Sequence, residues 1–396
     1  MLACPFLLLT FHRSHALKKV YTQLAKYEKL SEHQKALIPK FPSYMKSVEE
    51  CIDSNANFIS QILANAKSEI FEGDHVQSFA CYVSIKMYQF LVDQNPTINK
   101  VVQNGDPGQR YRFGITSNDM DKVRSTLKQF VRDWSTVGAP ERHSSYDPVL
   151  REIHTAFRSS DSFVDSTEDV LPRPTSDIRV LVPGAGLGRL AWEIAHCGYT
   201  CQGNEWSLFM LLPAHFVLNT CRDLNQYTLY PWVTQSSNNV CRENQLAAIT
   251  IPDVSPFDLP PDVQFSMVAG DFSEVYTEPA SWDCVATVFF IDTAHNILDY
   301  LETIWKILVY GFVHKFPLPL GPLLYHFADV PGQDSIELSY SEVREAAELI
   351  GFEILKEEQD LPSTYTQDPK SMLQYHYKCV LTVFRKPLTA QSAPQD

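Results

Sequence analysis

Apolar residues recur at helical spacing through the first part of the chain. Residues 15–70 contain few glycines and carry this spacing in HALKKVYTQLAKYEKL and MKSVEECIDSNANFISQILANAKSEIF, with a proline-bounded turn, PKFPS, between them. A further helix is predicted over SNDMDKVRSTLKQFVRDWS, where Ser117 or Asn118 can cap the first turn. Another helix is predicted over residues 146–157. The pattern indicates a helical N-terminal region.

Two segments interrupt this helical pattern. Residues 73–118 mix apolar runs with turn signals and predict an insertion or loop. The polar stretch SSDSFVDSTEDVLPRPTSD predicts a linker with a domain boundary near residue 170. We therefore expect a helical region over 1–170, with the insertion at 73–118, and a second domain over 171–396.

From residue 178 the pattern alternates between strands and helices. The predicted strands are IRVLVP, YTCQGNE, VQFSMVAGDF and WDCVATVFFID, with GPLLYHF finishing a further one and FEILKEE and QYHYKCVLTVFRKP closing as an antiparallel pair. The predicted helices are GRLAWEIAHCG, SLFMLLPAHFVLNTC, HNILDYLETIWKIL and SYSEVREAAELIGF. This order predicts an α/β fold with a doubly wound, Rossmann-like parallel sheet.

The composition of the chain argues against several classes of function. A net charge of −14 argues against nucleic acid as a partner. The nine cysteines include one close pair, Cys197 and Cys201, with no second pair to complete a zinc site, so we expect no metal and reduced thiols in an intracellular protein. The apolar start, MLACPFLLLTFHR, is too short to span a membrane and lacks a preceding basic segment. No HExxH or GxSxG pattern supports hydrolase chemistry.

A glycine turn follows the first predicted strand of the sheet. Gly184, Gly186 and Gly188 allow backbone to approach a ligand and open a helix with free N–H groups. The G-x-G-x-G spacing differs from the dinucleotide fingerprint G-x-G-x-x-G, and no lysine follows to make a P-loop. Glu205, at the end of the next strand, can accept hydrogen bonds from both ribose hydroxyls. The alternative is a glycine turn that only packs helix against strand.

A third element lies in AGDFSEVY. Asp271 can accept the exocyclic amine of adenine and the Phe272 ring can stack on the base, although an Asp-Phe pair alone is also common in ordinary turns. Together with the glycine turn and Glu205, the pair favours adenosine recognition. This combination resembles the way class I methyltransferases hold S-adenosyl-L-methionine.

A more particular resemblance covers residues 117–387, with a weaker one over 15–70. The segments STLKQFVRDWS, VLVPGAGLGRLAWEIA, QGNEWS, FFIDTAHNILDYLETIWKIL, LGPLLYHF and IELSYSEV resemble the carnosine N-methyltransferase family. The resemblance implies methyl transfer from S-adenosyl-L-methionine to the imidazole of carnosine (β-alanyl-histidine), giving anserine. It leaves other histidine-containing di- and tripeptides open as substrates.

The resemblance also implies cofactor contacts. It places Gln129 and Arg132 at the methionine end, where a guanidinium can grip the carboxylate. From spacing alone, this pair at i and i+3 on a helix could equally be a solvated face. The other cofactor residues carried over are Gly184, Gly186, Glu205, Asp271 and Phe272.

For the substrate, the family's motifs point to Asp292, His326 and Tyr377 as catalytic residues. Asp292 follows a predicted strand, where open α/β sheets bind ligands, but it could instead cap the helix beginning near His295. His326 could be a packed histidine, and Tyr375 competes with Tyr377. We hypothesise that Asp292, assisted by His326, accepts the imidazole N–H and fixes the tautomer, while Tyr377 orients the ring.

The chain departs from the family pattern at residues 1–14, 75–115 and 309–320. The last segment carries two prolines where a central strand tolerates none. These departures keep two alternatives open: a protein-histidine or peptide methyltransferase, and a non-catalytic relative with a degraded site. We expect a cytoplasmic location, with the nucleus as a second option, and leave a homodimer open.

Overall fold

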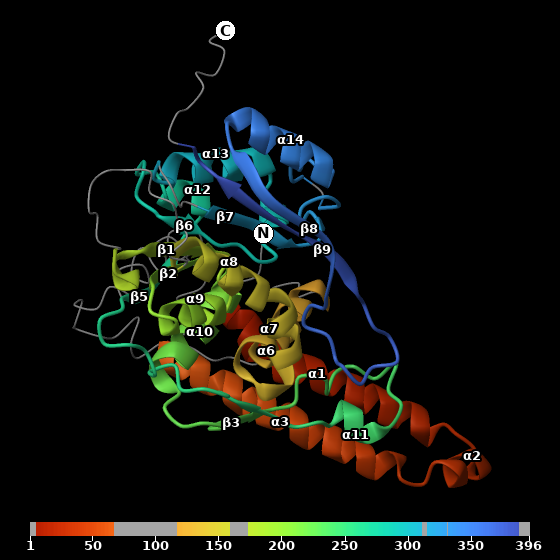
Figure 1. The fold of residues 1–396 in the computed structure, drawn as a ribbon. Helices are drawn as coiled ribbons and strands as arrows, with labels where there is room; N and C mark the ends of the chain where they lie inside the picture. The colour runs from red at the N-terminus through yellow and green to blue at the C-terminus, as the bar shows by residue number, and fades with distance from the viewer. Residues whose placement is uncertain (1–4, 67–116, 159–172, 311–314, 331, 388–396) are drawn as a thin grey trace, which may run out of the picture. The chain divides into compact units, whose positions relative to one another are not determined.

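The computed structural model covers most of the chain. It describes residues 5–66, 117–158, 173–310, 315–330 and 332–387 (Figure 1). The insertion predicted at 73–118 lies almost wholly outside the described residues, as does the boundary predicted near residue 170. Both stay predictions.

The chain divides into two compact units built from discontinuous segments. Unit 1 comprises residues 1–138, 207–257 and 366–375. Unit 2 comprises residues 139–206, 258–365 and 376–396. The chain therefore passes repeatedly from one unit to the other, and each unit is described by itself.

Unit 1 is built mainly of helices. They are α1 (Pro5–Glu28), α2 (Glu32–Leu37), α3 (Phe41–Ala66), α6 (Ser117–Trp134), the 3-10 turn η3 (Thr136–Gly138), α10 (Leu208–Thr220) and α11 (Arg242–Gln245). Strands β3 (Tyr227–Leu229) and β4 (Ile249–Ile251) form an antiparallel pair. The long helices α1 and α3 lie side by side (Figure 1) and bury Val20, Val48 and Ile52 between them. The helices predicted over 15–70 and at residue 117 are confirmed.

The apolar start of the chain belongs to α1. Leu8 and Leu9 are buried, so this part of the atypical segment 1–14 packs as part of a helix. The helix predicted from SLFMLLPAHFVLNTC is also confirmed, as α10, but it belongs to unit 1 rather than to the unit that holds the sheet.

Unit 2 contains the parallel sheet. Strands β1 (Arg179–Pro183), β2 (Thr200–Glu205), β5 (Phe265–Ala269) and β6 (Cys284–Val285) run parallel in the order β5-β2-β1-β6. Strands β7 (Lys315–Gly321), β8 (Glu353–Ser363) and β9 (Tyr377–Arg385) form an antiparallel sheet in the order β7-β9-β8. The predicted α/β class and the closing antiparallel pair are confirmed.

Helices cover the parallel sheet on both faces. They are α7 (Ala139–Ser145), α8 (Asp147–Arg158), α9 (Arg189–His196), α12 (Phe272–Val275), α13 (Ile297–Ile307) and α14 (Tyr340–Ile350), with 3-10 turns η4 (Thr175–Asp177) and η5 (Ile291–Thr293). Val180 and Val182 of β1 enter one apolar core with α9, whereas Leu181 enters a second core with α13 and α14. A strand buried on both faces explains the continuous apolar run IRVLVP.

Two predicted strands differ in the structure. WDCVATVFFID forms a strand only at Cys284–Val285, and further along Phe289 takes a left-handed φ of 52°, which a strand residue does not adopt. GPLLYHF overlaps a strand only at Gly321, and the N–H of Leu324 donates to the Asp292 carboxylate instead of to a strand. A run of apolar residues alone does not show that either predicted strand is shortened.

Strand β7 accommodates the two prolines of the atypical segment. Pro317 and Pro319 lack N–H donors, and within the described sheet β7 is an edge strand that pairs with β9 alone. Pro317 lies opposite Val383 of β9. The prolines are therefore compatible with a strand because they occupy a sheet edge.

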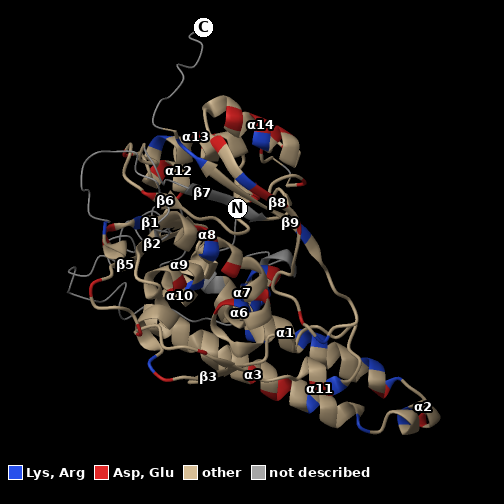
Figure 2. Cartoon of the chain, viewed as in Figure 1, with Lys and Arg blue, Asp and Glu red and all other residues tan. Residues whose placement is uncertain are grey.

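Charged residues of both signs are mixed over the fold. Figure 2 shows acidic and basic residues interspersed along α14 and along the helices α1 and α3. Among the described helices, none combines the length and the apolarity needed to cross a membrane.

Candidate active site

The glycine turn joins β1 to α9 at the carboxyl edge of the parallel sheet. Gly184, Gly186 and Gly188 all have positive φ, at 65°, 57° and 83°. A Cβ added at Gly184 would lie 2.5 Å from Cδ2 of Phe290. The turn therefore requires glycine both for backbone conformation and for space.

Replacing Gly184 by alanine tests this requirement. We expect a loss of about 1 to 3 kcal/mol in the free energy of unfolding, because the left-handed backbone and the Phe290 contact both oppose a Cβ. Gly332→Ala is the matched control, because Gly332 has a φ of 78° and no atom within 4 Å of an added Cβ. Chemical denaturation of the two variants checks the prediction, and equal losses would contradict it.

Glu205 lies directly at this turn. Its Oε2 accepts a hydrogen bond from the Gly186 N–H at 3.0 Å, and its Oε1 accepts from the Trp206 N–H at 2.9 Å. The neighbouring Ala185 N–H donates to the Asn204 carbonyl at 2.9 Å. A carboxylate has about four lone-pair positions, which suits it to accept from the hydroxyls of a ribose.

Asp271 follows β5, the strand that pairs with the strand of Glu205, and is the N-cap of α12. Its Oδ1 caps α12 by accepting from the Ser273 N–H at 2.9 Å and the Glu274 N–H at 3.3 Å. The Gly270 N–H donates to the Glu205 carbonyl at 3.0 Å, which holds the two acidic residues on neighbouring strand ends. Among the described residues Oδ2 of Asp271 accepts no hydrogen bond and can serve a ligand.

The Phe272 ring does not have the exposed face that base stacking requires. It is 2% exposed and packs edge-on against Phe290 and Tyr300, at ring-centroid distances of 5.6 and 5.3 Å. The predicted stacking on adenine therefore conflicts with this packing. The Phe272 ring packs in the core beneath the turn. A ligand at this turn would therefore meet the backbone and not the ring.

Asp292 and His326 come together through the backbone. The His326 N–H donates to the Asp292 carbonyl at 3.0 Å, and the Leu324 N–H donates to Oδ2 of Asp292 at 2.8 Å. Asp292 lies in η5 and is 3% exposed, whereas His326 is exposed. Burial raises the pKa of Asp292, and the Leu324 bond and the His326 charge oppose that rise. Asn296 caps α13, which excludes the alternative that Asp292 is its N-cap.

Tyr377 begins β9 in the same unit. Its ring meets Phe289 at 6.2 Å, and Phe289 lies three residues before Asp292. Tyr375 belongs to unit 1 and is 62% exposed. This placement favours Tyr377 over Tyr375 as the partner of the Asp292 segment.

Two residues near this group have unusual backbone conformations. Phe289 has a φ of 52° and Tyr325, directly before His326, has a φ of 38°. Bulky residues rarely take the left-handed region, and such strain concentrates at functional sites. The strained positions lie beside Asp292 and His326.

Gln129 and Arg132 lie on α6 in unit 1. Both are buried, which excludes a solvated helix face. Gln129 Nε2 donates to Oδ2 of Asp133 at 3.0 Å, and Arg132 Nη1 lies 3.6 Å from Oδ1 of the same residue. A buried guanidinium needs a nearby negative charge, which Asp133 supplies.

Comparison with known proteins decides the family. The family model for carnosine N-methyltransferase matches residues 110–388. Carnosine N-methyltransferase of Mus musculus is 43% identical over 361 residues, covering 91% of this chain and 80% of the relative. The Drosophila melanogaster relative is 39% identical, covering 95% and 77%, and the Schizosaccharomyces pombe relative is 38% identical, covering 87% and 84%. The chain belongs to the carnosine N-methyltransferase family.

The residues at the glycine turn fit the methyl donor of this family of methyltransferases, S-adenosyl-L-methionine. Glu205 presents a carboxylate for the ribose, and Asp271 presents Oδ2 for the adenine amine. The backbone at Gly184 and Gly186 can approach the ligand because no Cβ intervenes. The acceptor set and the turn therefore suit an adenosine group.

Sequence reasoning missed three residues that contact the candidate site residues. Asn204 Nδ2 donates to the carbonyls of Val268 and Gly270, which fixes the end of β5 beside Glu205. Tyr300 stacks on Phe290 at 4.7 Å, and burial with the nearby Asp271 and Glu205 charges raises its pKa to about 12.

Asp133, the third, pairs with Gln129 and Arg132. The sequence could have indicated Asp133 because it lies inside the motif KQFVRDW, and Asn204 because it lies inside QGNEWS.

Proposed function

We propose that the chain methylates the imidazole of carnosine to give anserine and S-adenosylhomocysteine. The observation that carries this proposal is the buried Asp292 carboxylate, held by the Leu324 N–H beside His326, in a chain of the carnosine N-methyltransferase family. A buried acceptor next to an exposed histidine suits a small ligand that carries an N–H group.

The chemistry requires positioning above all. When bound, S-adenosyl-L-methionine supplies a methyl group already activated on a positively charged sulfur. The protein then has to hold the imidazole lone pair in line with the S–CH₃ bond and exclude water, effects that can contribute about 7 to 11 kcal/mol. Rigid elements around the site serve this purpose better than flexible loops.

Asp292 selects the reactive nitrogen in this proposal. Neutral imidazole has one N–H and one lone pair, so an acceptor for the N–H of the far nitrogen leaves the near nitrogen to attack. The carboxylate also stabilises the positive charge that develops on the ring. His326 assists Asp292, and Tyr377 orients the imidazole beside Phe289.

The proposed cofactor roles are supported by the acceptor groups at the glycine turn and by the family resemblance. Glu205 accepts from the ribose hydroxyls, Asp271 accepts from the adenine amine, and Gln129 and Arg132 serve the methionine end. Arg132 is suited to a carboxylate because its planar guanidinium can donate two parallel hydrogen bonds. The cytoplasmic or nuclear location and the homodimer stay predictions.

Two parallel incubations distinguish a dipeptide substrate from a protein substrate. The purified chain is incubated with labelled S-adenosyl-L-methionine and either carnosine or a mixture of intact histidine-containing proteins. We expect label in carnosine and none in the proteins. Label in the proteins with none in carnosine would indicate a protein-histidine methyltransferase instead.

A further inference from the structure

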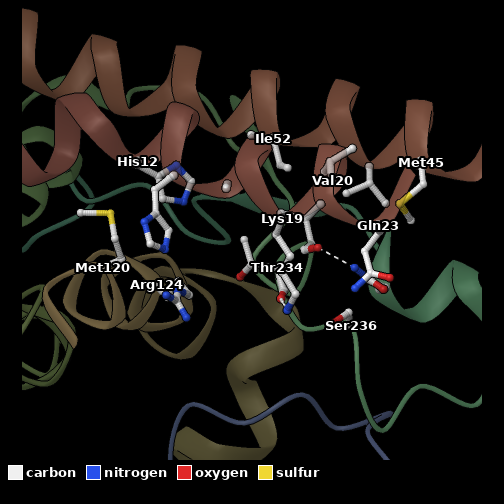
Figure 3. Close-up of a pocket in the computed structure, with 15 residues that line it drawn as sticks. His12, Lys19, Val20, Gln23, Met45, Ile52, Met120, Arg124, Thr234 and Ser236 are labelled. Atoms are coloured by element: carbon white, nitrogen blue, oxygen red, sulfur yellow. Dashed lines mark hydrogen bonds between the residues drawn. The ribbon is translucent and has the colours of Figure 1, made fainter. Parts of the chain in front are cut away.

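Unit 1 contains a pocket that the proposed methyl transfer does not use. It has a volume of about 80 Å³ and lies among α1, α3, α6 and the segment that follows β3. Figure 3 shows His12, Met120 and Arg124 at one end, Gln23 and Met45 at the other, and Lys19 and Thr234 between them. The pocket is open to small ligands on the surface of a helical unit.

The lining is basic. His12, His15 and Lys19 come from α1 and Arg124 comes from α6. No acidic residue is among the described residues that line the pocket. The counter-charge present nearby is Asp121, whose Oδ1 lies 2.8 Å from Nη1 of Arg124 on the exposed side. Lys19 and Arg124 therefore supply the positive charge of the pocket, His12 and His15 add imidazole nitrogens, and Arg124 has further N–H donors to offer.

His12 is the buried member of this group. It is 3% exposed, and neither ring nitrogen has a hydrogen-bond partner among the described residues. Buried polar atoms in folded proteins nearly always have a partner, which can be water or a ligand. Burial, Arg124 and His15 lower the pKa of His12 to about 4, and burial, followed by the Arg124 charge, lowers the pKa values of His15 and Lys19.

Apolar residues close the opposite wall. Val20, Val48 and Ile52 line the pocket and belong to the core between α1 and α3. Such walls lower the local dielectric and strengthen the attraction between an anion and the basic groups. Lys19 Nζ already donates to the Thr234 carbonyl at 3.1 Å, which holds its charge at the rim.

We propose that this pocket binds the oxyanionic group of a small metabolite, a phosphate or a carboxylate, through His12, His15, Lys19 and Arg124. The volume of about 80 Å³ is enough for one such group. Three of the four basic residues lie on α1, and Arg124 lies on α6. The pocket is independent of the methyl-transfer chemistry proposed above.

Histidine ring NMR of the whole chain tests this site directly. Inorganic phosphate and, separately, acetate are titrated at constant ionic strength, with sodium chloride as the reference. Binding should raise the pKa of His12 above about 4 and shift the His12 and His15 ring signals, because an anion favours the charged imidazole. Stronger binding of phosphate or of acetate identifies which oxyanion the pocket prefers.

Lysine variants locate the binding. Lys19→Gln should weaken binding at least about tenfold, because it removes one charge-assisted contact. Lys18→Gln is the matched control, since Lys18 is the exposed neighbour on α1 outside the pocket. Unmoved ring signals with both anions, or equal weakening in both variants, would overturn the proposal. The readout is binding, so it stands apart from carnosine turnover.

Discussion

Replacing Asp292 by asparagine should lower methyl transfer to carnosine by about 10²- to 10⁴-fold. The amide keeps the volume and can still accept the Leu324 N–H, so the fold should survive. It carries no negative charge to stabilise the imidazolium, and its NH₂ group can hold the wrong tautomer. Turnover measured with saturating cofactor and carnosine gives the size of the loss.

Asp299→Asn is the matched control for this variant. Asp299 is exposed on α13 and accepts from the Asn296 side chain, away from the Asp292 carboxylate. Its turnover should equal that of the unchanged chain. S-adenosylhomocysteine should bind both variants with unchanged affinity. Full turnover in Asp292→Asn would show that the carboxylate does not set the tautomer.

Replacing Glu205 by glutamine should weaken binding of S-adenosylhomocysteine by about 100-fold or more. Two charge-assisted hydrogen bonds to ribose are weakened, and each is worth roughly 1.5 to 3 kcal/mol. The backbone bonds from Gly186 and Trp206 now share one remaining acceptor oxygen, so the turn itself also loosens. Titration calorimetry measures the dissociation constant.

Glu274→Gln makes the same chemical change close by. Glu274 is exposed in the first turn of α12, three residues beyond Asp271, and its side chain has no role in the proposed site. Its affinity for S-adenosylhomocysteine should match that of the unchanged chain. Equal affinities in all three proteins would remove Glu205 from the cofactor site.

The spacing of apolar residues along the chain predicted the helices and strands whose buried faces follow a regular local pattern. The apolar run of β1, the glycine turn and Glu205 all fall within residues 179–205, and hydrogen bonds bring them together in the structure. Helices α1, α3 and α6 likewise show their buried faces as helical spacing. The position of Glu205 at the glycine turn is therefore predictable from the sequence.

The remaining features of the fold and the candidate site depend on contacts between residues that are distant in the sequence. The apolar run WDCVATVFFID predicts one long strand, but only Cys284–Val285 forms one, and Phe289 has a left-handed backbone. The Phe272 ring looks available in the sequence because its burial by Phe290 and Tyr300 depends on residues far along the chain. The assignment of α10 to unit 1 similarly depends on contacts that no local pattern records.

The account's central claim is that this chain methylates the imidazole of carnosine. Mass spectrometry of carnosine incubated with the chain and isotopically methyl-labelled S-adenosyl-L-methionine tests it, with fragmentation to locate the label. We predict a single labelled methyl group on the imidazole nitrogen nearer the side-chain attachment. Unlabelled carnosine from a folded chain that binds the cofactor, or label on the β-alanyl amine, would contradict it.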